Sequence, residues 1–492
     1  MPTDTGLRLY AVVKATPELH SAYSNSDKST VYTLLTDYTR KLLQEHPYDS
    51  FSTQTLIDSF QVIGAPSKDW KAAFVGDDEY PDMDLSKEPP ETLIPDELII
   101  IYAFESSSQL RQFISVVHHG RTIDSDAPIS GAGVDIGVAS ADHWCPGTGN
   151  LEAFGNRMHA RRTVRADALT AAIPPLRGRK VNVVLVDEGL HKGSFAAKNW
   201  GGGLDWLPPP PATPIPAGSA ERTSHGMMIA RTILDLAPDA VLYDVPLIPP
   251  RITKGFFLGT SSADAVYRRL LLEIWLRRFF PRWAGPWIFV NAWAIFDRSA
   301  EPSLGDYTEN KNMTSLYGHP LITAVKWAIR PFDFDVIFAA GNCGEFCASK
   351  HCGGLDRGPG HSIWGANALP EVITAGAVLT DEMWAGYSSQ GPGPSNNGLA
   401  HDKPDFCAPS NFREANDAAV INSGTSTACA MTAGVVAALR SNPSWDQRYV
   451  SPAMLHSALT SSARKTQGPY WNGRLGHGIL DAAAAMGKLP PA

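Results

Sequence analysis

The stretch Asn422-Ser-Gly-Thr-Ser-Thr-Ala-Cys-Ala-Met-Thr-Ala-Gly-Val-Val-Ala-Ala-Leu439 decides the fold, because a glycine-bearing turn leads directly into a run with helical spacing of apolar residues. Ser426 lies at the start of this expected helix, where backbone N–H groups are unpaired and the helix dipole is positive. Negative charge developing beside its oxygen would be stabilised there, as an acyl-transfer nucleophile requires. Taken alone, the Gly-Thr-Ser sequence favours the interpretation that Thr425 or Ser426 merely caps the helix. The rest of the chain distinguishes these roles.

The composition is that of a globular protein, with 492 residues, of which 43% are hydrophobic and 19% charged. This length predicts two or three domains. The 42 lysines and arginines against 50 aspartates and glutamates give a net charge of -8, and no basic block occurs. A nucleic-acid partner is therefore not expected.

The first residues lack the cationic start and apolar stretch of a secretory signal. The most apolar long stretch, residues 270–289, carries Glu273, three arginines and Pro281, so it does not predict a membrane span. We expect a cytoplasmic protein without a membrane partner.

From residue 180 onward, apolar runs typical of buried strands alternate with segments of helical periodicity. This alternation predicts an α/β domain with a parallel sheet covered on both faces, whose functional residues gather beyond the carboxyl ends of the strands. Strands are expected at 181–186, 240–245, 287–290, 334–340 and 372–375, and helices at 227–236, 263–279, 321–329 and 427–441.

The N-terminal part has a different pattern. Residues 1–130 predict an α+β unit with strands at 7–15 and 97–104 and helices at 30–43 and 107–117, residues 131–175 a connector, and residues 176–492 the second domain. Within the first unit, the acidic residues 77–91 are interpreted as a solvated linker, the alternative being a calcium site. The proline-rich residues 207–216 predict a stiff surface loop.

Three polar residues follow the expected strands or begin the expected helices. Asp187 ends the first strand of the second domain, His225 begins a helix next to Gly226, and Asn342 ends a later strand. Each alone would be a turn or surface residue. In the order Asp, His, Ser they supply a nucleophile, its base and a carboxylate that orients the base, which is the order found in subtilisin.

Residues 180–486 resemble the subtilisin-like serine proteases. The resemblance is carried by the aspartate motif at 186–189, the histidine motif His225-Gly-Met-Met-Ile-Ala230, the unchanged Ala-Ala-Gly-Asn at 339–342, and the serine motif at 424–430. Four further segments, at 372–378, 387–392, 403–409 and 476–482, are similar to the late core of the family. The resemblance implies a subtilisin-like three-layer α/β fold with a mainly parallel sheet.

The resemblance also implies a serine endopeptidase mechanism. Ser426 would attack the peptide carbonyl, His225 would take and return its proton, and Asp187 would orient the imidazole. Asn342 and the backbone N–H of Ser426 would bind the oxyanion. No cofactor is required by this chemistry. Calcium often stabilises members of the family, but its ligands have no recognisable position here.

Two departures from the family pattern concern the serine helix and the substrate strand. Ala430 replaces a proline, and Asn291-Ala-Trp-Ala-Ile295 replaces Asn-x-Ser-x-Gly. By resemblance, substrate would contact Asn291, Ala292 and Trp293 on one side, and Ala339, Ala340 and Gly341 on the other. Because Trp293 and Ile295 add bulk, we expect a narrowed or reshaped pocket and an unusual substrate preference.

The N-terminal unit has a positional counterpart in the family, an α+β prodomain that assists folding and blocks the cleft. A retained regulatory or partner-binding domain is the alternative. The expected partners are thus a protein or peptide substrate and the chain's own N-terminal domain as an inhibitor.

The six cysteines include a cluster of Cys343, Cys347 and Cys352 next to His351. A metal site, a local disulfide and free thiols are three open interpretations. The other cysteines, Cys145, Cys407 and Cys429, are expected to be single thiols.

Two other functions remain to be weighed against the peptidase. One is a catalytically silent binding protein whose cleft is closed by Trp293. The other is an esterase on a different α/β sheet, which is disfavoured because its serine would lie in Gly-x-Ser-x-Gly and precede the acid and base.

Overall fold

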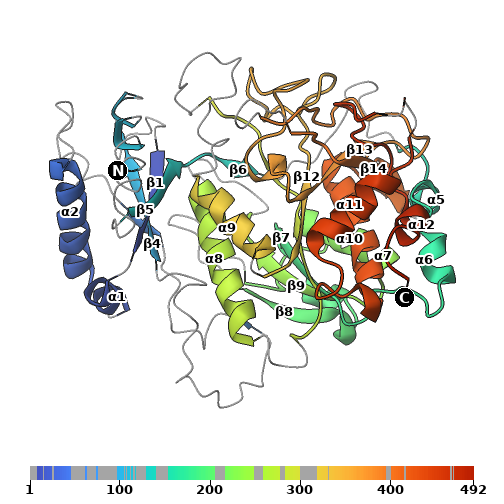
Figure 1. Ribbon diagram of the computed structural model, residues 1–492, viewed down its shortest axis with the longest axis horizontal. Coiled ribbons are helices and arrows are strands. Elements are labelled where there is room, and N and C mark those ends of the chain that lie inside the picture. The colour runs from blue at the N-terminus through green and yellow to red at the C-terminus, as the bar shows by residue number, and fades with distance from the viewer. Residues whose placement is uncertain are drawn as a thin grey trace.

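The central sheet of the computed structural model has eight strands (Figure 1). Neighbouring strands are parallel except for the last pair at one edge. Their order is β14 (Phe406–Pro409), β13 (Ile373–Val378), β12 (Asp335–Ala339), β10 (Trp287–Asn291), β7 (Asn182–Asp187), β9 (Val241–Pro246), β8 (Trp200–Leu204) and β3 (Phe74–Val75). The structure describes residues 8–14, 16–24, 27–45, 61–63, 74–75, 97–104, 106, 108–110, 112–114, 117, 129–139, 153–204, 216–248, 259–277, 283–299, 319–330, 332–394, 401–414, 417–465, 468 and 470–491.

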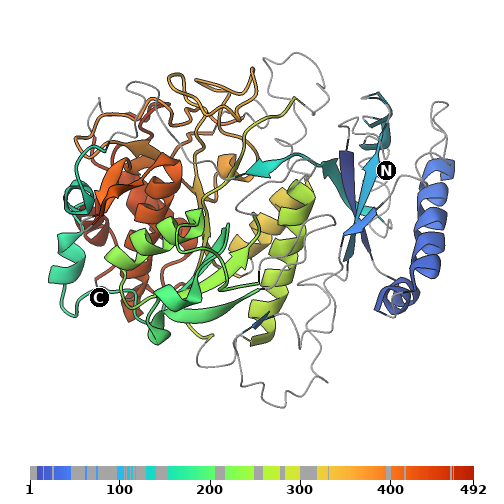
Figure 2. The same ribbon diagram turned by 180° about the vertical axis from the view of Figure 1, so that it is seen from behind.

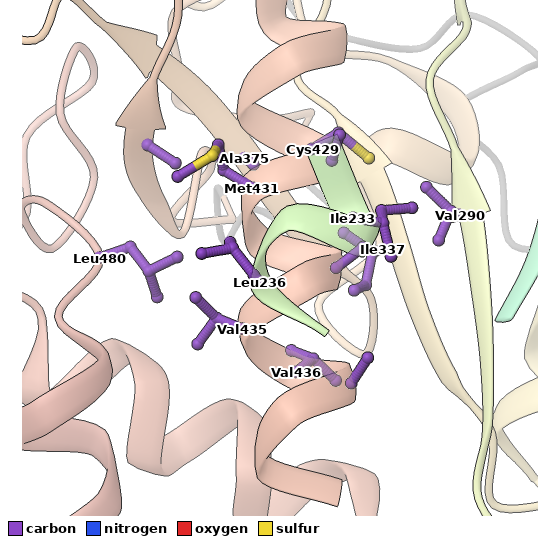
Figure 3. Close-up of a cluster of buried hydrophobic side chains, with 14 of the residues drawn as sticks. Ile233, Leu236, Val290, Ile337, Ala375, Cys429, Met431, Val435, Val436 and Leu480 are labelled. Atoms are coloured by element: carbon purple, nitrogen blue, oxygen red, sulfur yellow. The ribbon is translucent and has the colours of Figure 1, made fainter. Parts of the chain in front are cut away.

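Helices cover both faces of this sheet. The helices α7 (His225–Leu236) and α10 (Gly424–Arg440) lie on one face, and α8 (Thr260–Arg277) and α9 (Pro320–Ile329) lie on the other (Figures 1 and 2). Apolar side chains of α7 and α10 pack against those of the central strands, as Figure 3 shows for Ile233, Leu236, Val290, Ile337, Val435 and Val436. Because both faces are covered, every residue of β7 is buried. The predicted three-layer α/β fold with a mainly parallel sheet is confirmed.

The N-terminal unit contains a four-stranded antiparallel sheet in the order β2 (Gln61–Ile63), β4 (Glu97–Ala103), β1 (Arg8–Lys14) and β5 (Ile129–Val134). The helices α1 (Pro17–Ser24) and α2 (Lys28–Glu45) lie on its outer side, and its other side faces α8 and α9 (Figure 1). Side chains from this unit cap both of these helices. Ser261 N donates to Asp135 Oδ1 over 3.0 Å, and Leu321 N donates to Tyr10 Oη over 2.9 Å.

The elements between residues 129 and 171 are divided between the two units. Strand β5 continues to Val134, beyond residue 130, where we expected the N-terminal unit to end. The helices α5 (Arg157–Thr163) and α6 (Asp167–Ala171) lie in the expected connector, yet their buried residues Ala160 and Leu169 belong to the same hydrophobic cluster as α10. Residues 157–171 are thus packed on the domain that carries Ser426.

The remaining elements are short or lie late in the chain. They are β6 (Val138–Ala139), β11 (Ala294–Ile295), β15 (Phe412–Glu414), β16 (Asp417–Asn422), α11 (Pro452–Ser462) and α12 (Ala482–Met486). The acidic stretch 77–91, residues 207–215 and Cys145 lie outside the described residues. Among the helices that the structure describes, none has the length and apolar character needed to cross a membrane.

Candidate active site

Ser426 lies in the first turn of α10, at the carboxyl edge of the sheet. The turn into the helix passes through Gly424, whose φ of 77° is readily adopted by glycine. The Ser426 side chain is buried, and its Oγ donates to the carbonyl oxygen of Ala292 over 3.1 Å. In this structure the hydroxyl is therefore hydrogen-bonded to the segment that follows β10.

Asp187 and His225 form a buried pair at the same edge. Asp187 is the last residue of β7 and His225 the first residue of α7, and Asp187 Oδ1 lies 2.7 Å from His225 Nδ1. The histidine backbone is also fixed, because His225 N donates to Glu188 Oε2 over 3.1 Å. With Nδ1 facing the carboxylate, the ring presents Nε2 as its other nitrogen, as a general base for a serine requires.

Gly226 explains how α7 comes close enough to β7 for this pair to form. A Cβ at position 226 would lie 2.5 Å from the carbonyl oxygen of Gly189, inside any normal contact distance. The helix also begins with a cap that ties it to the same turn, since Ser224 Oγ donates to Gly189 O over 2.9 Å. The sequence His-Gly at the helix start is thus a packing requirement.

The serine helix runs alongside the histidine helix. Thr427, next to Ser426, lies with its Oγ1 3.8 Å from Met228 Sδ, and a Cβ at Gly434 would lie 2.9 Å from that of Leu236. These two contacts, seven residues apart on α10 and eight apart on α7, show that the helices are parallel and in contact from their first turns. The first turn of α10, which carries Ser426, therefore lies beside the first turn of α7, which carries His225.

Asn342 is held by the residue before Ser426. Thr425 donates to Asn342 Oδ1 through both its backbone N, over 3.0 Å, and its Oγ1, over 2.9 Å, while Gly341 N donates to Thr425 Oγ1 over 3.1 Å. Because Oδ1 faces Thr425, the amide nitrogen Nδ2 is directed away from it. Sequence reasoning missed the role of Thr425 in holding this amide and that of Glu188 in holding His225. The only sequence signal was that each is adjacent to a candidate residue.

The strand segment expected to contact substrate is turned partly into the core. Asn291 is fully buried, its Oδ1 accepting from Tyr267 Oη over 2.8 Å and its Nδ2 donating to Ile337 O over 3.3 Å. The Trp293 ring packs edge-on against Phe338 with 5.4 Å between ring centroids. The side chains of Asn291 and Trp293 therefore fill the core.

The opposite segment is equally buried. Ala339 O accepts from Asn367 Nδ2 over 2.6 Å, and Ala340 N donates to Ala375 O over 2.9 Å. Gly341 has a φ of 102°, which turns the chain toward Asn342. These residues shape the turn at the end of β12 through their backbone.

The N-terminal unit reaches this region through β6. Strand β6 pairs antiparallel with β11, with Ala139 opposite Ala294 and Val138 opposite Ile295. On its other side, Gly137 pairs antiparallel with Gly259. Residues 137–139 thus pair with two backbone segments, one of which, β11, begins two residues after Ala292, whose carbonyl accepts from Ser426.

The cysteine cluster contains a disulfide. Cys343 and Cys352 are bonded to each other, and Cys347 is also disulfide-bonded. Of the three interpretations, the disulfide holds for Cys343 and Cys352, whose sulfurs are then not available as thiolate ligands. Cys407 and Cys429 are buried free thiols, and burial raises the pKa of both. Within the described ranges, His, Cys, Asp and Glu side chains form no group of three that could hold a metal ion.

A cavity of about 770 Å³ lies away from Ser426, beside α11. Its wall includes the buried pair of Lys403 and Asp405, whose Nζ and Oδ2 are 2.7 Å apart, and His456, whose Nε2 is 2.9 Å from Asp405 Oδ1. Burial opposes ionisation of Asp405, but His456 and Lys403 outweigh it and lower the pKa to about 2. This carboxylate is structural, since it also accepts from Thr374 N over 2.6 Å.

The fold and the site together define a class, an α/β hydrolytic enzyme with a helix-start serine beside an aspartate–histidine pair. The chain belongs to the subtilase family, whose model matches residues 205–478, more than half of the 492 residues. It is a serine peptidase, and its substrates are proteins or peptides. The matched range includes His225, Asn342 and Ser426.

Solved structures similar to this chain include three of MycP1. MycP1 from the ESX-1 type VII secretion system is 16% identical, with a TM-score of 0.45, and the match covers 72% of this chain and 93% of that one. MycP1 with the N-terminal propeptide removed is 18% identical, with a TM-score of 0.43, and the match covers 68% of this chain and 98% of that one. MycP1 from Mycobacterium smegmatis is 16% identical, with a TM-score of 0.43, and the match covers 73% of this chain and 91% of that one. No curated protein matches the sequence.

Proposed function

We propose that the protein is a serine endopeptidase in which Ser426 is the nucleophile, His225 the general base and acid, and Asp187 the residue that orients the imidazole. The observation that carries this proposal is the 2.7 Å contact between Asp187 Oδ1 and His225 Nδ1, at the sheet edge where α10 begins. To react, the Ser426 hydroxyl must leave the Ala292 carbonyl and donate to His225 Nε2.

Asn342 would donate from Nδ2 to the oxyanion, together with the backbone N–H of Ser426. Support comes from the two hydrogen bonds that hold Asn342 Oδ1 against Thr425, because a donor fixed before the reaction costs no reorganisation in the transition state. This mechanism draws every reacting group from side chains and backbone, so it requires no cofactor. A structural calcium ion stays a prediction without assigned ligands.

The N-terminal unit would inhibit the enzyme. In the family resembled, the strand that contains Ala294 and Ile295 pairs with an extended substrate, and in this chain it pairs with β6. A substrate and residues 137–139 would then compete for the same backbone groups. On this proposal residues 1–139 act as an intramolecular inhibitor, whether they are later removed as a prodomain or retained.

A fluorophosphonate probe tests the catalytic assignment. We expect labelling of the wild type that disappears in Ser426→Ala and persists in Ser423→Ala, a matched control in the same turn of α10. Failure to label the folded full-length protein and any shortened form that arises from it would support the silent binding protein.

Intact-mass measurement on the same proteins tests inhibition and processing. If the N-terminal unit is cut by the enzyme itself, the wild type is shortened and Ser426→Ala is full length. If both are full length, self-processing is refuted. If the N-terminal unit inhibits the enzyme, the probe should label faster when β6 no longer pairs with β11. A Val138→Asp variant tests this, and Tyr449→Asp, at an exposed position, is the control.

The cytoplasmic location expected from the N-terminal sequence stays a prediction, and the Cys343–Cys352 disulfide weighs against it. Disulfides persist in oxidising compartments and are rare in the cytoplasm. Alkylation of free thiols in freshly lysed cells, followed by mass spectrometry of the peptides around residue 343, would show which state exists in the cell.

A further inference from the structure

The disulfide closes the loop that follows the oxyanion candidate Asn342. Cys343 is the next residue along the chain, and its bond to Cys352 closes a loop whose backbone returns to the substrate strand. There Gly353 N donates to Phe296 O over 2.8 Å. The disulfide thus fixes a loop that begins after Asn342 and ends at a backbone hydrogen bond with the continuation of β11.

Four side chains fill the space between these two segments. Ala294 and Phe296 from the substrate strand pack with Cys343 and Cys352 in one hydrophobic cluster, and each is at most 5% exposed. The segments also approach each other directly. A Cβ at Gly341 would lie 3.7 Å from Cβ of Ala294, an ordinary van der Waals distance that leaves no room for a large side chain between them.

The two partly buried residues that pack against this cluster, Ala139 and Ala348, are both small. Ala139 of β6 packs on it while its backbone pairs with Ala294. Val138, which pairs with Ile295, lies outside the cluster. In this structure β6 therefore presents one methyl group, that of Ala139, to the cluster formed by the disulfide, Ala294 and Phe296.

We propose that the Cys343–Cys352 disulfide, with Phe296 behind it, sets the size of the primary specificity pocket and restricts cleavage to bonds that follow a small residue: glycine, alanine or serine. The disulfide fixes the loop that forms one wall, and the hydrogen bond from Gly353 N to Phe296 O holds this loop against the other wall, so a larger side chain would have to displace buried groups. This inference rests on the proposed peptidase function.

The loop also holds the Asn342 backbone. Ser349 N donates to Asn342 O over 2.8 Å, and Gly358 N donates to Cys343 O over 2.8 Å. Reduction of the disulfide releases the constraint on both segments. We therefore expect reduction to relax the size preference and at the same time to lower the turnover of small-residue substrates.

The experiment begins with fluorophosphonate titration of the wild-type protein, which counts active sites. A second, unlabelled portion of the same preparation is incubated with a peptide library of unbiased sequence, and the cleaved bonds are identified by mass spectrometry. We expect at least a tenfold preference for small over aromatic or leucine residues before the cleaved bond, since pocket contacts of this kind discriminate about 10- to 200-fold. If the probe labels the preparation and its unlabelled portion cuts after large and small residues alike, the inference is overturned, whereas absence of labelling would overturn the peptidase proposal.

Two variants assign the preference to these residues. The double variant Cys343→Ala, Cys352→Ala and the single variant Phe296→Ala should each admit larger residues, and Phe346→Ala, an exposed phenylalanine in the same loop, should not. If the double variant does not fold, Phe296→Ala and reduction of the wild type carry the test. A preference unchanged in Phe296→Ala and after reduction would show that the disulfide cluster does not set it.

Discussion

At the scale of single residues, the best-defined part of the site is the amide of Asn342. Two donors of Thr425 fix Oδ1, and the loop closed by the disulfide fixes the backbone. An oxyanion donor is effective only if it is oriented before charge develops, so Thr425 would act on the reaction through Asn342. Thr425 is therefore a positioning residue.

Thr425→Val tests this role, because valine keeps the shape of threonine and removes the Oγ1 hydrogen bonds to Asn342 and Gly341. We expect kcat for a peptide substrate to fall about tenfold, less than the roughly 10²- to 10³-fold typical of deleting the donor itself, with little change in KM. Thr427→Val is the matched control, since its Oγ1 donates only within its own helix, to Ser423 O over 2.9 Å, apart from a 3.8 Å contact with Met228 Sδ. Equal losses in both variants would indicate a structural effect of the substitution.

The residue pattern predicted some of this geometry and could not predict the rest. The positions of Asp187, His225 and Ser426 could be predicted, because strand ends, helix starts and the order of the motifs can be recognised in the sequence alone. The burial of the Asn291 side chain could not be predicted in this way, because it depends on a hydrogen bond from Tyr267, which lies on a separate helix. The pairing of Thr425 with Asn342 likewise joins residues 83 positions apart.

At the scale of elements, the site depends on how closely α7 approaches the end of β7. Gly226→Ala would place a methyl group 2.5 Å from the Gly189 carbonyl, which forces the helix start away from Asp187. We expect a loss of about 1–3 kcal/mol in the free energy of unfolding, typical of overpacking. Activity should fall about 10²-fold, as a shift of about 1 Å in a catalytic group can cause.

Gly354→Ala is the control for this variant, because a Cβ there meets no atom within 4 Å. Urea unfolding and peptide hydrolysis of the three proteins provide the two measurements. If Gly226→Ala retains wild-type activity, the close approach is not what positions His225.

The sequence located the long elements better than the short ones. The helices with strong apolar periodicity, α7 to α10, lie within a few residues of their predicted ranges. Strand β8 was missed because Trp200-Gly-Gly-Gly-Leu204 lacks the branched residues that indicate a strand, although a Cβ at Gly201 or Gly203 would contact β9 at 2.6 Å or less. The two-residue strands β6 and β11 have no periodicity of their own and form only by pairing with each other.

At the scale of the whole molecule, the N-terminal unit is docked on the amino ends of α8 and α9 (Figure 2). His319, which precedes α9, lies buried in this interface with Nε2 3.2 Å from Val134 O and its ring edge-on to Tyr10. Burial lowers the pKa of His319 to about 4. Asp135 beside it is paired with Arg8, and burial raises the pKa of its carboxyl.

The sign of the His319 effect follows from its lowered pKa. Between pH 6.5 and about 4 the unfolded chain binds a proton on this histidine that the folded chain excludes, so stability falls as the pH falls. The loss should reach roughly 2 kcal/mol at pH 5 and about 3 kcal/mol below pH 4, at about 1.4 kcal/mol for each unit. Asp135 acts in the opposite direction, since its raised pKa costs stability as the pH rises, so a variant at position 319 is needed to separate the two.

We expect His319→Gln to remove this part of the pH dependence of the free energy of unfolding. The variant is made in a Ser426→Ala background, which prevents self-cleavage. Urea unfolding at pH 7 and pH 5 measures this dependence, and His191→Gln is the control, because His191 is partly exposed and its backbone lies beside Met227 of α7. We expect the drop between the two pH values to be smaller by roughly 2 kcal/mol in His319→Gln and unchanged in the control. An equal drop in all three proteins would mean that His319 is protonated without cost, and that docking of the N-terminal unit does not depend on keeping this ring neutral.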